Sequence, residues 1–111
     1  MFNSNDKLQE MQLLEQNMQN LSMQKQAFQM EFSETESALK EINSSGDEVF
    51  KIIGQIMLKT HKQKIIDELS NKKKFLDLKI KNLENQEKSF AEKADLLREE
   101  ILKSNEKNQK K

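Results

Sequence analysis

The fold is decided by one stretch near the middle of the chain, Val49-Phe50-Lys51-Ile52-Ile53-Gly54-Gln55-Ile56-Met57-Leu58-Lys59-Thr60. This stretch is rich in β-branched and aromatic residues, which favour strands, and a Gly-Gln pair divides it into two halves. A two-residue loop with glycine in first place is typical of a type II′ turn, whose twist suits a β-hairpin. We therefore predict a hairpin at about residues 49–60, with Gly54 and Gln55 as its turn.

Both faces of the predicted hairpin are largely apolar. A lone two-stranded hairpin is marginally stable in water, and open edges beside apolar faces favour aggregation. We therefore expect this segment to oligomerise by pairing with other hairpins into a closed sheet or barrel. The residues expected to carry this assembly are Val49, Phe50, Ile52, Ile53, Gly54, Ile56, Met57 and Leu58.

An apolar repeat of 3.5 residues flanks the hairpin on both sides, which is typical of helices that keep one seam against a partner helix. In the N-terminal arm the seam positions are Met11, Leu14, Met18, Leu21, Lys25, Phe28, Phe32, Thr35, Leu39 and Ile42. In the C-terminal arm they are Ile66, Leu69, Lys73, Leu76, Ile80, Leu83, Glu87, Phe90, Ala94, Leu97 and Ile101. We predict helices at about 6–43 and 62–104, a basic tail at 105–111, and a single domain over residues 1–111. Between the first helix and the hairpin, Gly46 is suited to the left-handed conformation that follows a helix end.

The two arms share one antiparallel register. If Ile42 is placed opposite Ile66, each of the other seam positions of the first arm also falls opposite a seam position of the second. This register supports a fold-back arrangement in which the arms form an antiparallel coiled coil. Two arrangements are open for Lys25 and Glu87, which fall in adjacent layers of the seam. They form an ion pair across it, or both extend into water with their stems packed.

The composition agrees with this fold and excludes several classes of protein. The chain has 111 residues, of which 34% are hydrophobic and 34% charged, whereas a typical globular domain is about 45–50% apolar and about 25% charged. It contains no Pro, so long helices can run unbroken. Basic and acidic residues are equal in number, 19 each, which argues against a nucleic-acid binder.

The residue types that catalysis or metal binding requires are scarce. The chain has one His and no Cys, so we predict no catalytic residue, no metal site and no cofactor. No apolar run approaches the ~20 residues of a membrane-spanning helix, and no signal peptide is expected at the N-terminus. We therefore expect a cytoplasmic protein that is not an enzyme and that binds neither nucleic acid nor membranes.

In the fold-back arrangement both termini lie at the free end of the coiled coil, here called the tip (about residues 2–18 and 90–104). Apolar residues are more numerous there than one seam requires, and exposed apolar surface marks an interaction site. The alternative is that they are only seam, flanking and fraying residues, which is the simpler interpretation of the residues alone. The candidate binding residues of the tip are Phe2, Leu8, Met11, Leu13, Leu14, Leu96, Leu97, Ile101 and Leu102.

The hairpin and its two arms together resemble the prefoldin family, in particular its archaeal-type β class with a single hairpin per chain. The most specific part is the pattern aromatic-Lys-x-x-Gly-x-x-x-x-Lys-Thr at residues 50–60. The heptads from Gln24 to Ile42 and the segment Leu83–Lys88 are similar too, and the resemblance covers about residues 8–102. One departure is Ser44-Ser45-Gly46, in a region that often bears Pro and Asp in the family.

The resemblance implies an α2β4 hexamer, in which this chain assembles with a longer α-type subunit and with other copies of itself. Their hairpins would form a β-barrel body that carries six coiled coils. It also implies a molecular chaperone, an ATP-independent holdase that binds unfolded polypeptides at the coiled-coil tips and transfers them to a group II chaperonin. The alternative, from another class, is a structural or tethering coiled coil that forms parallel dimers and stays helical through residues 43–60.

Overall fold

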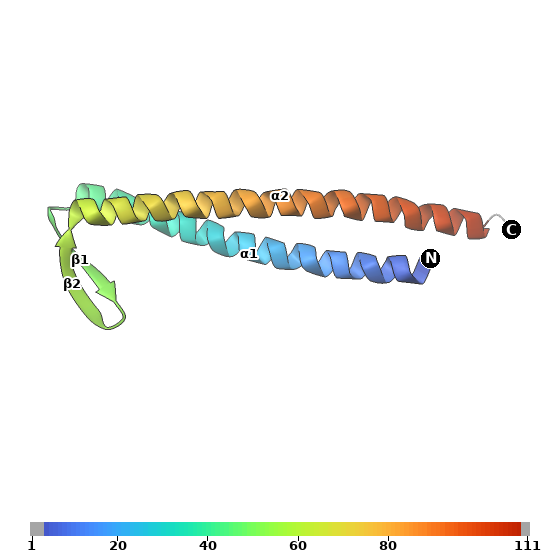
Figure 1. The fold of residues 1–111 in the computed structure, drawn as a ribbon, viewed down its shortest axis with the longest axis horizontal. Helices are drawn as coiled ribbons and strands as arrows, with labels where there is room; N and C mark the ends of the chain where they lie inside the picture. The colour runs from blue at the N-terminus through green and yellow to red at the C-terminus, as the bar shows by residue number, and fades with distance from the viewer. Residues whose placement is uncertain (1–3, 110–111) are drawn as a thin grey trace. The chain divides into compact units, whose positions relative to one another are not determined.

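The computed structural model describes residues 4–109, and the side chains of residues 5–104. Its elements follow one another along the chain as a long helix, two strands and a second long helix (Figure 1). They are α1 (Ser4–Ser44), β1 (Glu48–Ile53), β2 (Ile56–His61) and α2 (Lys62–Gln109). The strands pair in an antiparallel hairpin, so the mainly α fold class predicted from the sequence is confirmed.

By its internal contacts the chain divides into two compact units. The described part of unit 1 consists of residues 4–26 and 81–109, and unit 2 consists of residues 27–80. In each unit a part of α1 lies alongside a part of α2, and unit 2 also contains the hairpin (Figure 1). The single domain over residues 1–111 stays a prediction.

The core follows the heptad seam. Every buried residue of the described chain occupies a predicted seam position, and every other seam position is half-buried. The buried residues are Met11, Leu21, Thr35, Ile42, Leu76, Ile80, Leu83, Ala94 and Leu97. In unit 1, the cluster of Met11, Ala94 and Leu97 packs against Leu14, Met18 and Ile101. In unit 2, Leu76 is the most deeply buried side chain, with 2% of its surface exposed.

The polar seam positions are each satisfied in a different way. In unit 1, the Nζ of Lys25 lies 2.8 Å from Oε1 of Glu87, so the ion pair across the seam is the arrangement that forms. In unit 2, the buried hydroxyl of Thr35 donates to the backbone carbonyl of Glu31 at 2.8 Å. Lys73 places its ammonium 5.6 Å from the centroid of the Phe32 ring, within reach of a cation–π interaction.

The hairpin has the register that its sequence predicts. Ile53 pairs with Ile56 across the turn, and the ladder extends to Glu48 opposite His61. Gly54 has a φ of +60°, and no residue other than glycine has a positive φ in the described chain. A positive φ at the first turn residue and not at the second is the pattern of a type II′ turn, which excludes type I′.

The end of α1 differs from what the sequence predicts. Gly46 was expected in the left-handed conformation, but Gly54 is the glycine with a positive φ in the described chain. The terminal carbonyls of α1 are bound by side chains instead: the hydroxyl of Ser45 donates to Ile42 O at 2.8 Å. The ammonium of Lys62, the first residue of α2, donates to Asn43 O at 3.2 Å and to Ser45 O at 2.8 Å. A cation therefore stabilises the negative end of the helix dipole.

Candidate functional site

The tip residues predicted from the sequence separate into two groups in unit 1. The leucines outside the seam are exposed: Leu8 by 48%, Leu13 by 59%, Leu96 by 63% and Leu102 by 57%. The seam members are less accessible: Met11 and Leu97 are buried, whereas Leu14 and Ile101 are half-buried. Phe2 lies outside the described residues. The exposed leucines are therefore the tip residues that are free to contact another chain.

The heptad explains why these leucines are exposed. Leu13 and Leu96 each come two residues after a buried seam residue, Met11 and Ala94 respectively, so the helical turn carries them away from the seam. An apolar side chain at such a position gains little from the coiled coil itself, because more than half of its surface stays exposed. The exposed leucines on both helices of unit 1 are therefore not needed for packing the seam and are available for contacts with another chain.

A shallow groove lies beside Leu96, one of the exposed leucines of the tip. It has a volume of about 220 Å³ and is lined by Glu10, Leu14, Lys93, Leu96, Leu97 and Glu100. Pockets for small ligands usually have volumes of about 300–1,000 Å³, so this groove is small for such a ligand. Three leucines and three charged residues line it, a mixture that suits individual side chains of a polypeptide better than a small ligand.

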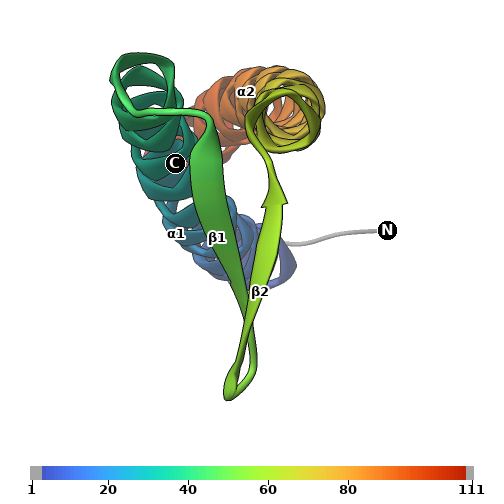
Figure 2. The same cartoon turned by 90° about the vertical axis from the view of Figure 1, so that its left-hand side faces the viewer.

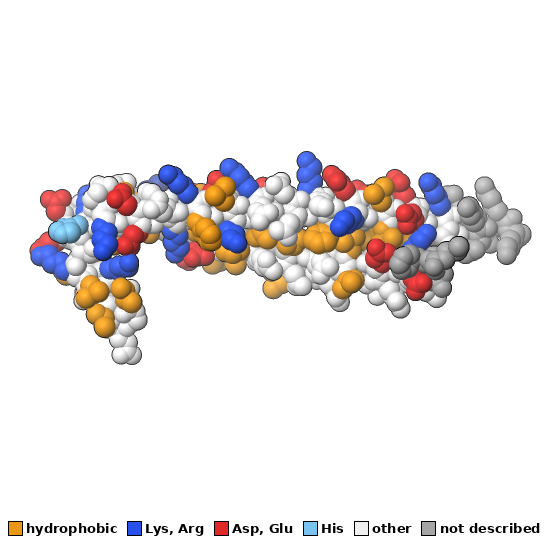
Figure 3. Space-filling model, in the orientation of Figure 1, with side chains coloured by type: hydrophobic (Ala, Val, Ile, Leu, Met, Phe, Trp, Pro, Cys, Tyr) orange, Lys and Arg blue, Asp and Glu red, His pale blue; other side chains and the backbone are white. Residues whose placement is uncertain are grey.

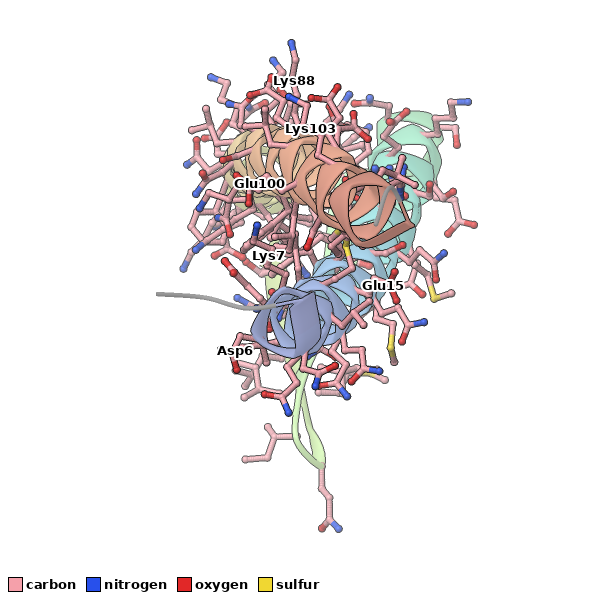
Figure 4. The ribbon with its side chains drawn as sticks, turned by 90° about the vertical axis from the view of Figure 1, so that its right-hand side faces the viewer. Asp6, Lys7, Glu15, Lys88, Glu100 and Lys103 are labelled. Carbon is pink, nitrogen blue, oxygen red and sulfur yellow. The ribbon has the colours of Figure 1, made fainter. Side chains whose placement is uncertain are left out.

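Charged side chains surround the groove and partly pair with one another. Figure 4 shows Lys7 of α1 and Glu100 of α2 on facing sides of unit 1, where their charged atoms lie 3.8 Å apart. The ammonium of Lys93 lies 5.6 Å from the ring centroid of Phe90.

The hairpin forms the second exposed apolar surface, and it belongs to unit 2. On one face, Phe50 is 58%, Ile52 is 68% and Met57 is 63% exposed. On the other face, the residues nearest the turn are also exposed; they are Ile53, Ile56 and Leu58. Only Val49 among the predicted apolar assembly residues is half-buried. Figure 3 shows these side chains as a group of apolar atoms on the projecting hairpin.

One ion pair joins the hairpin to a helix. The Nζ of Lys51 lies 2.9 Å from Oε2 of Glu68 on α2, and the hydrogen bond lowers the pKa of the Glu68 carboxyl. Sequence reasoning missed this pair and the contacts of Lys62 because neither follows from the heptad. Both depend on how the hairpin leaves the helices, which Figure 2 shows from the end of unit 2.

Three further features concern metal ions, membranes and the single histidine. Within the described chain, no cluster of three or more His, Cys, Asp or Glu side chains is arranged to hold a metal ion. None of the described helices combines the length and the apolar character needed to cross a membrane. His61 is the last residue of β2 and is exposed.

The comparisons with known proteins agree on one family. The family model described as "Prefoldin subunit" matches residues 5–108, nearly the whole chain. The chain belongs to the prefoldin family. The prefoldin subunit beta of Thermococcus onnurineus is 36% identical over 89 residues, which cover 78% of this chain and 77% of that protein. The prefoldin subunit beta of Methanothrix thermoacetophila is 31% identical over 101 residues, covering 89% and 84%.

A solved structure shows the same fold. The crystal structure of the prefoldin beta subunit from Thermococcus strain KS-1 superposes with a TM-score of 0.85 at 34% identity, covering 91% of this chain and 90% of that one. Prefoldins are a family of non-enzymatic chaperone subunits, and prefoldin beta subunits form complexes with other prefoldin subunits. Family membership therefore implies a chaperone function for this chain.

Proposed function

We propose that this prefoldin chain is part of an ATP-independent holdase that binds unfolded polypeptides at its tip and transfers them to a group II chaperonin. The observation that carries the proposal is the exposure of Leu8, Leu13, Leu96 and Leu102 on helices whose seam is already filled. Unfolded chains expose apolar side chains, and burial of apolar surface requires no particular sequence in the partner. A surface of this kind suits a binder of many non-native proteins.

The strength of one such contact is modest. Complete burial of a leucine contributes about 1.5–3 kcal/mol, and these leucines already lose part of that surface on folding. Useful retention of a client therefore needs several tips that act together. Linked sites raise the effective concentration of one another, so an assembly of six tips would bind far more tightly than one.

We further propose that the hairpin supplies the assembly. Its apolar side chains are exposed on both faces, and its two strands have no third strand in the described chain. Pairing with the hairpins of a longer α-type subunit and of further copies would cover these faces and edges, as an α2β4 hexamer with a β-barrel body requires. The proposed complex is cytoplasmic and needs no catalytic residue or cofactor.

The tethering alternative finds less support. A parallel tether would continue as helix through residues 43–60, whereas α1 ends at Ser44 and two strands follow. The antiparallel contacts of Met11 with Leu97 in unit 1 also use the seam that a parallel dimer would need.

The test replaces the exposed tip leucines and leaves the seam intact. The variant carries Leu8→Gln, Leu13→Gln, Leu96→Gln and Leu102→Gln and is co-expressed with the longer subunit. We expect the complex to form and to lose most of its suppression of aggregation, measured by light scattering of a client protein diluted from denaturant. The matched control is Met23→Gln, since Met23 is 69% exposed in unit 1 outside the tip. Full protection by the tip variant would place the client site elsewhere.

A further inference from the structure

Three ion pairs in unit 2 connect different elements. The pair of Lys51 and Glu68 joins β1 to α2, with 2.9 Å between Nζ and Oε2. The other two pairs stay within the hairpin or within the helix pair. They are Lys59–Glu48 at 2.6 Å and Lys72–Glu31 at 3.2 Å. The first pair is thus the one whose loss would affect how the hairpin stands on the helix.

The hairpin also runs directly into α2 at His61 and Lys62, and Lys62 donates to Asn43 O and Ser45 O at this junction. Beyond the junction, few residues of the hairpin are covered by the helices. Among the residues of its two strands, Val49, Lys51 and Thr60 are half-buried and the rest are exposed. These three share one face, so that face rests toward the helices. In the connection to α1, Gly46 has open space where a side chain would lie, so no neighbouring atom packs against that position.

We infer that Lys51 and Glu68 are positioning residues for assembly: their ion pair holds the hairpin at one angle to α2 and thereby presents the opposite face to a neighbouring chain. That opposite face carries Phe50, Ile52 and Met57, which are each more than half exposed. The inference rests on the proposed assembly through the hairpin.

The physical reason is preorganisation. A hairpin that rocks on its connections must be ordered when it pairs with another, and the lost freedom weakens association. An ion pair at the protein surface adds little to the stability of the fold, so its removal should leave the helices almost unaffected. Its effect should therefore be seen in the hairpin angle and in assembly, and much less in the melting temperature.

The first experiment measures the angle in the full-length chain. Since the chain has no Cys, Gln55→Cys in the turn and Lys74→Cys on α2 introduce two sites for spin labels. We expect a narrow distance distribution by pulsed electron resonance with Lys51 and Glu68 in place, and a clearly broader one with Glu68→Gln. The charge reversal Lys51→Glu with Glu68→Lys should narrow the distribution again. The recovery should be only partial, because the charge of Lys64 also acts at position 68 and would repel the new lysine.

The matched controls break the other two ion pairs. Glu48→Gln removes the pair between the strands and Glu31→Gln the pair between the helices, and both should leave the distribution narrow. An unchanged distribution with Glu68→Gln, or equal broadening with all three substitutions, overturns the inference. The first result would show that the pair does not position the hairpin, and the second that any lost charge loosens the unit.

The second experiment measures assembly with the longer subunit by mass photometry. We expect Glu68→Gln to weaken association about threefold to tenfold, and both controls to leave it unchanged. A broader distance distribution with unaltered association overturns the inference, because the angle would then not be used for assembly. If the wild-type chain forms no complex with the longer subunit, the proposed assembly itself fails, and the inference fails with it. Whether the wild-type chain assembles tells these two failures apart.

Discussion

Lys25 and Glu87 meet across the seam of unit 1, with 2.8 Å between Nζ and Oε1, at positions where the repeat otherwise carries apolar side chains. About a quarter of each side chain is exposed, 24% for Lys25 and 27% for Glu87. The hydrogen bond to Glu87 raises the pKa of Lys25. In the register that places Ile42 opposite Ile66, Lys25 and Glu87 fall in adjacent layers, so their contact bridges two layers of the seam. The pair is therefore compatible with the antiparallel register, and its contribution to stability can be measured.

The first prediction reverses this pair. Lys25→Glu places two carboxylates together and should lower the melting temperature measured by circular dichroism. Lys25→Glu combined with Glu87→Lys restores opposite charges and should recover part of the loss. The interaction is read from the double-mutant cycle. A double variant no more stable than the sum of its single changes would show that the contact contributes nothing.

The second prediction compares two leucines on the same helix. Leu76→Ala should lower the free energy of unfolding by about 2–5 kcal/mol, because it opens a cavity in the most deeply buried layer of unit 2. The control is Leu78→Ala: Leu78 is 68% exposed, so its loss should change stability by less than about 0.5 kcal/mol. Urea denaturation measures both. Similar losses at the two positions would contradict the heptad assignment.

Much of this fold could be predicted because the heptad repeat indicates which side of each helix is buried. The seam residues and the turn at Gly54 follow from local spacing, and the Lys25–Glu87 pair is one of the two arrangements that the shared register left open. The exposed tip leucines were found by the same rule, as apolar residues that the seam does not use.

The contacts around the hairpin could not be predicted in the same way. Lys51 meets Glu68, and Lys62 meets the end of α1, only because the strands leave the helices at a certain angle. No periodic pattern encodes that angle. The expectation for Gly46 was wrong for a related reason: the Ser45 hydroxyl and Lys62 bind the helix-end carbonyls, so a left-handed residue is not needed there.

The third prediction tests the turn with two glycines. Gly54→Ala should destabilise the hairpin by about 1–2 kcal/mol, because φ is +60° there and an L side chain is strained in that conformation. Gly46→Ala should be neutral or slightly stabilising, since its φ is not positive and it too has open space for a side chain. Amide hydrogen exchange of the strand residues measures the effect. Equal protection in both variants would argue against the type II′ turn.

The fourth prediction concerns pH. Lys51, and to a smaller extent Lys64, lower the pKa of Glu68 below the value of 4.5 that it has when unperturbed. A carboxyl with a depressed pKa contributes stability above its unfolded pKa, and this contribution is lost as the pH falls through the folded pKa. The distribution of label distances between positions 55 and 74 should therefore stay narrow at pH 6 and broaden only when the pH falls below the ordinary titration range of a glutamate. The Glu68→Gln variant should be equally broad throughout, and a pH-dependent width in it would assign the change to another group.

The last prediction concerns the link between the two helices in unit 2. Lys62 donates to Asn43 O and Ser45 O, and α1 has no basic residue of its own in its last turn. Lys62→Met keeps the apolar stem and removes the cation, so the end of α1 should lose about 0.3–1 kcal/mol of stability. Hydrogen exchange should rise at the final turn of α1 and stay unchanged in β1 and β2. The control is Lys74→Met, which removes an exposed cation elsewhere on α2. Faster exchange at that turn in both variants would indicate a general charge effect, whereas a change in Lys62→Met alone assigns the helix cap to this side chain.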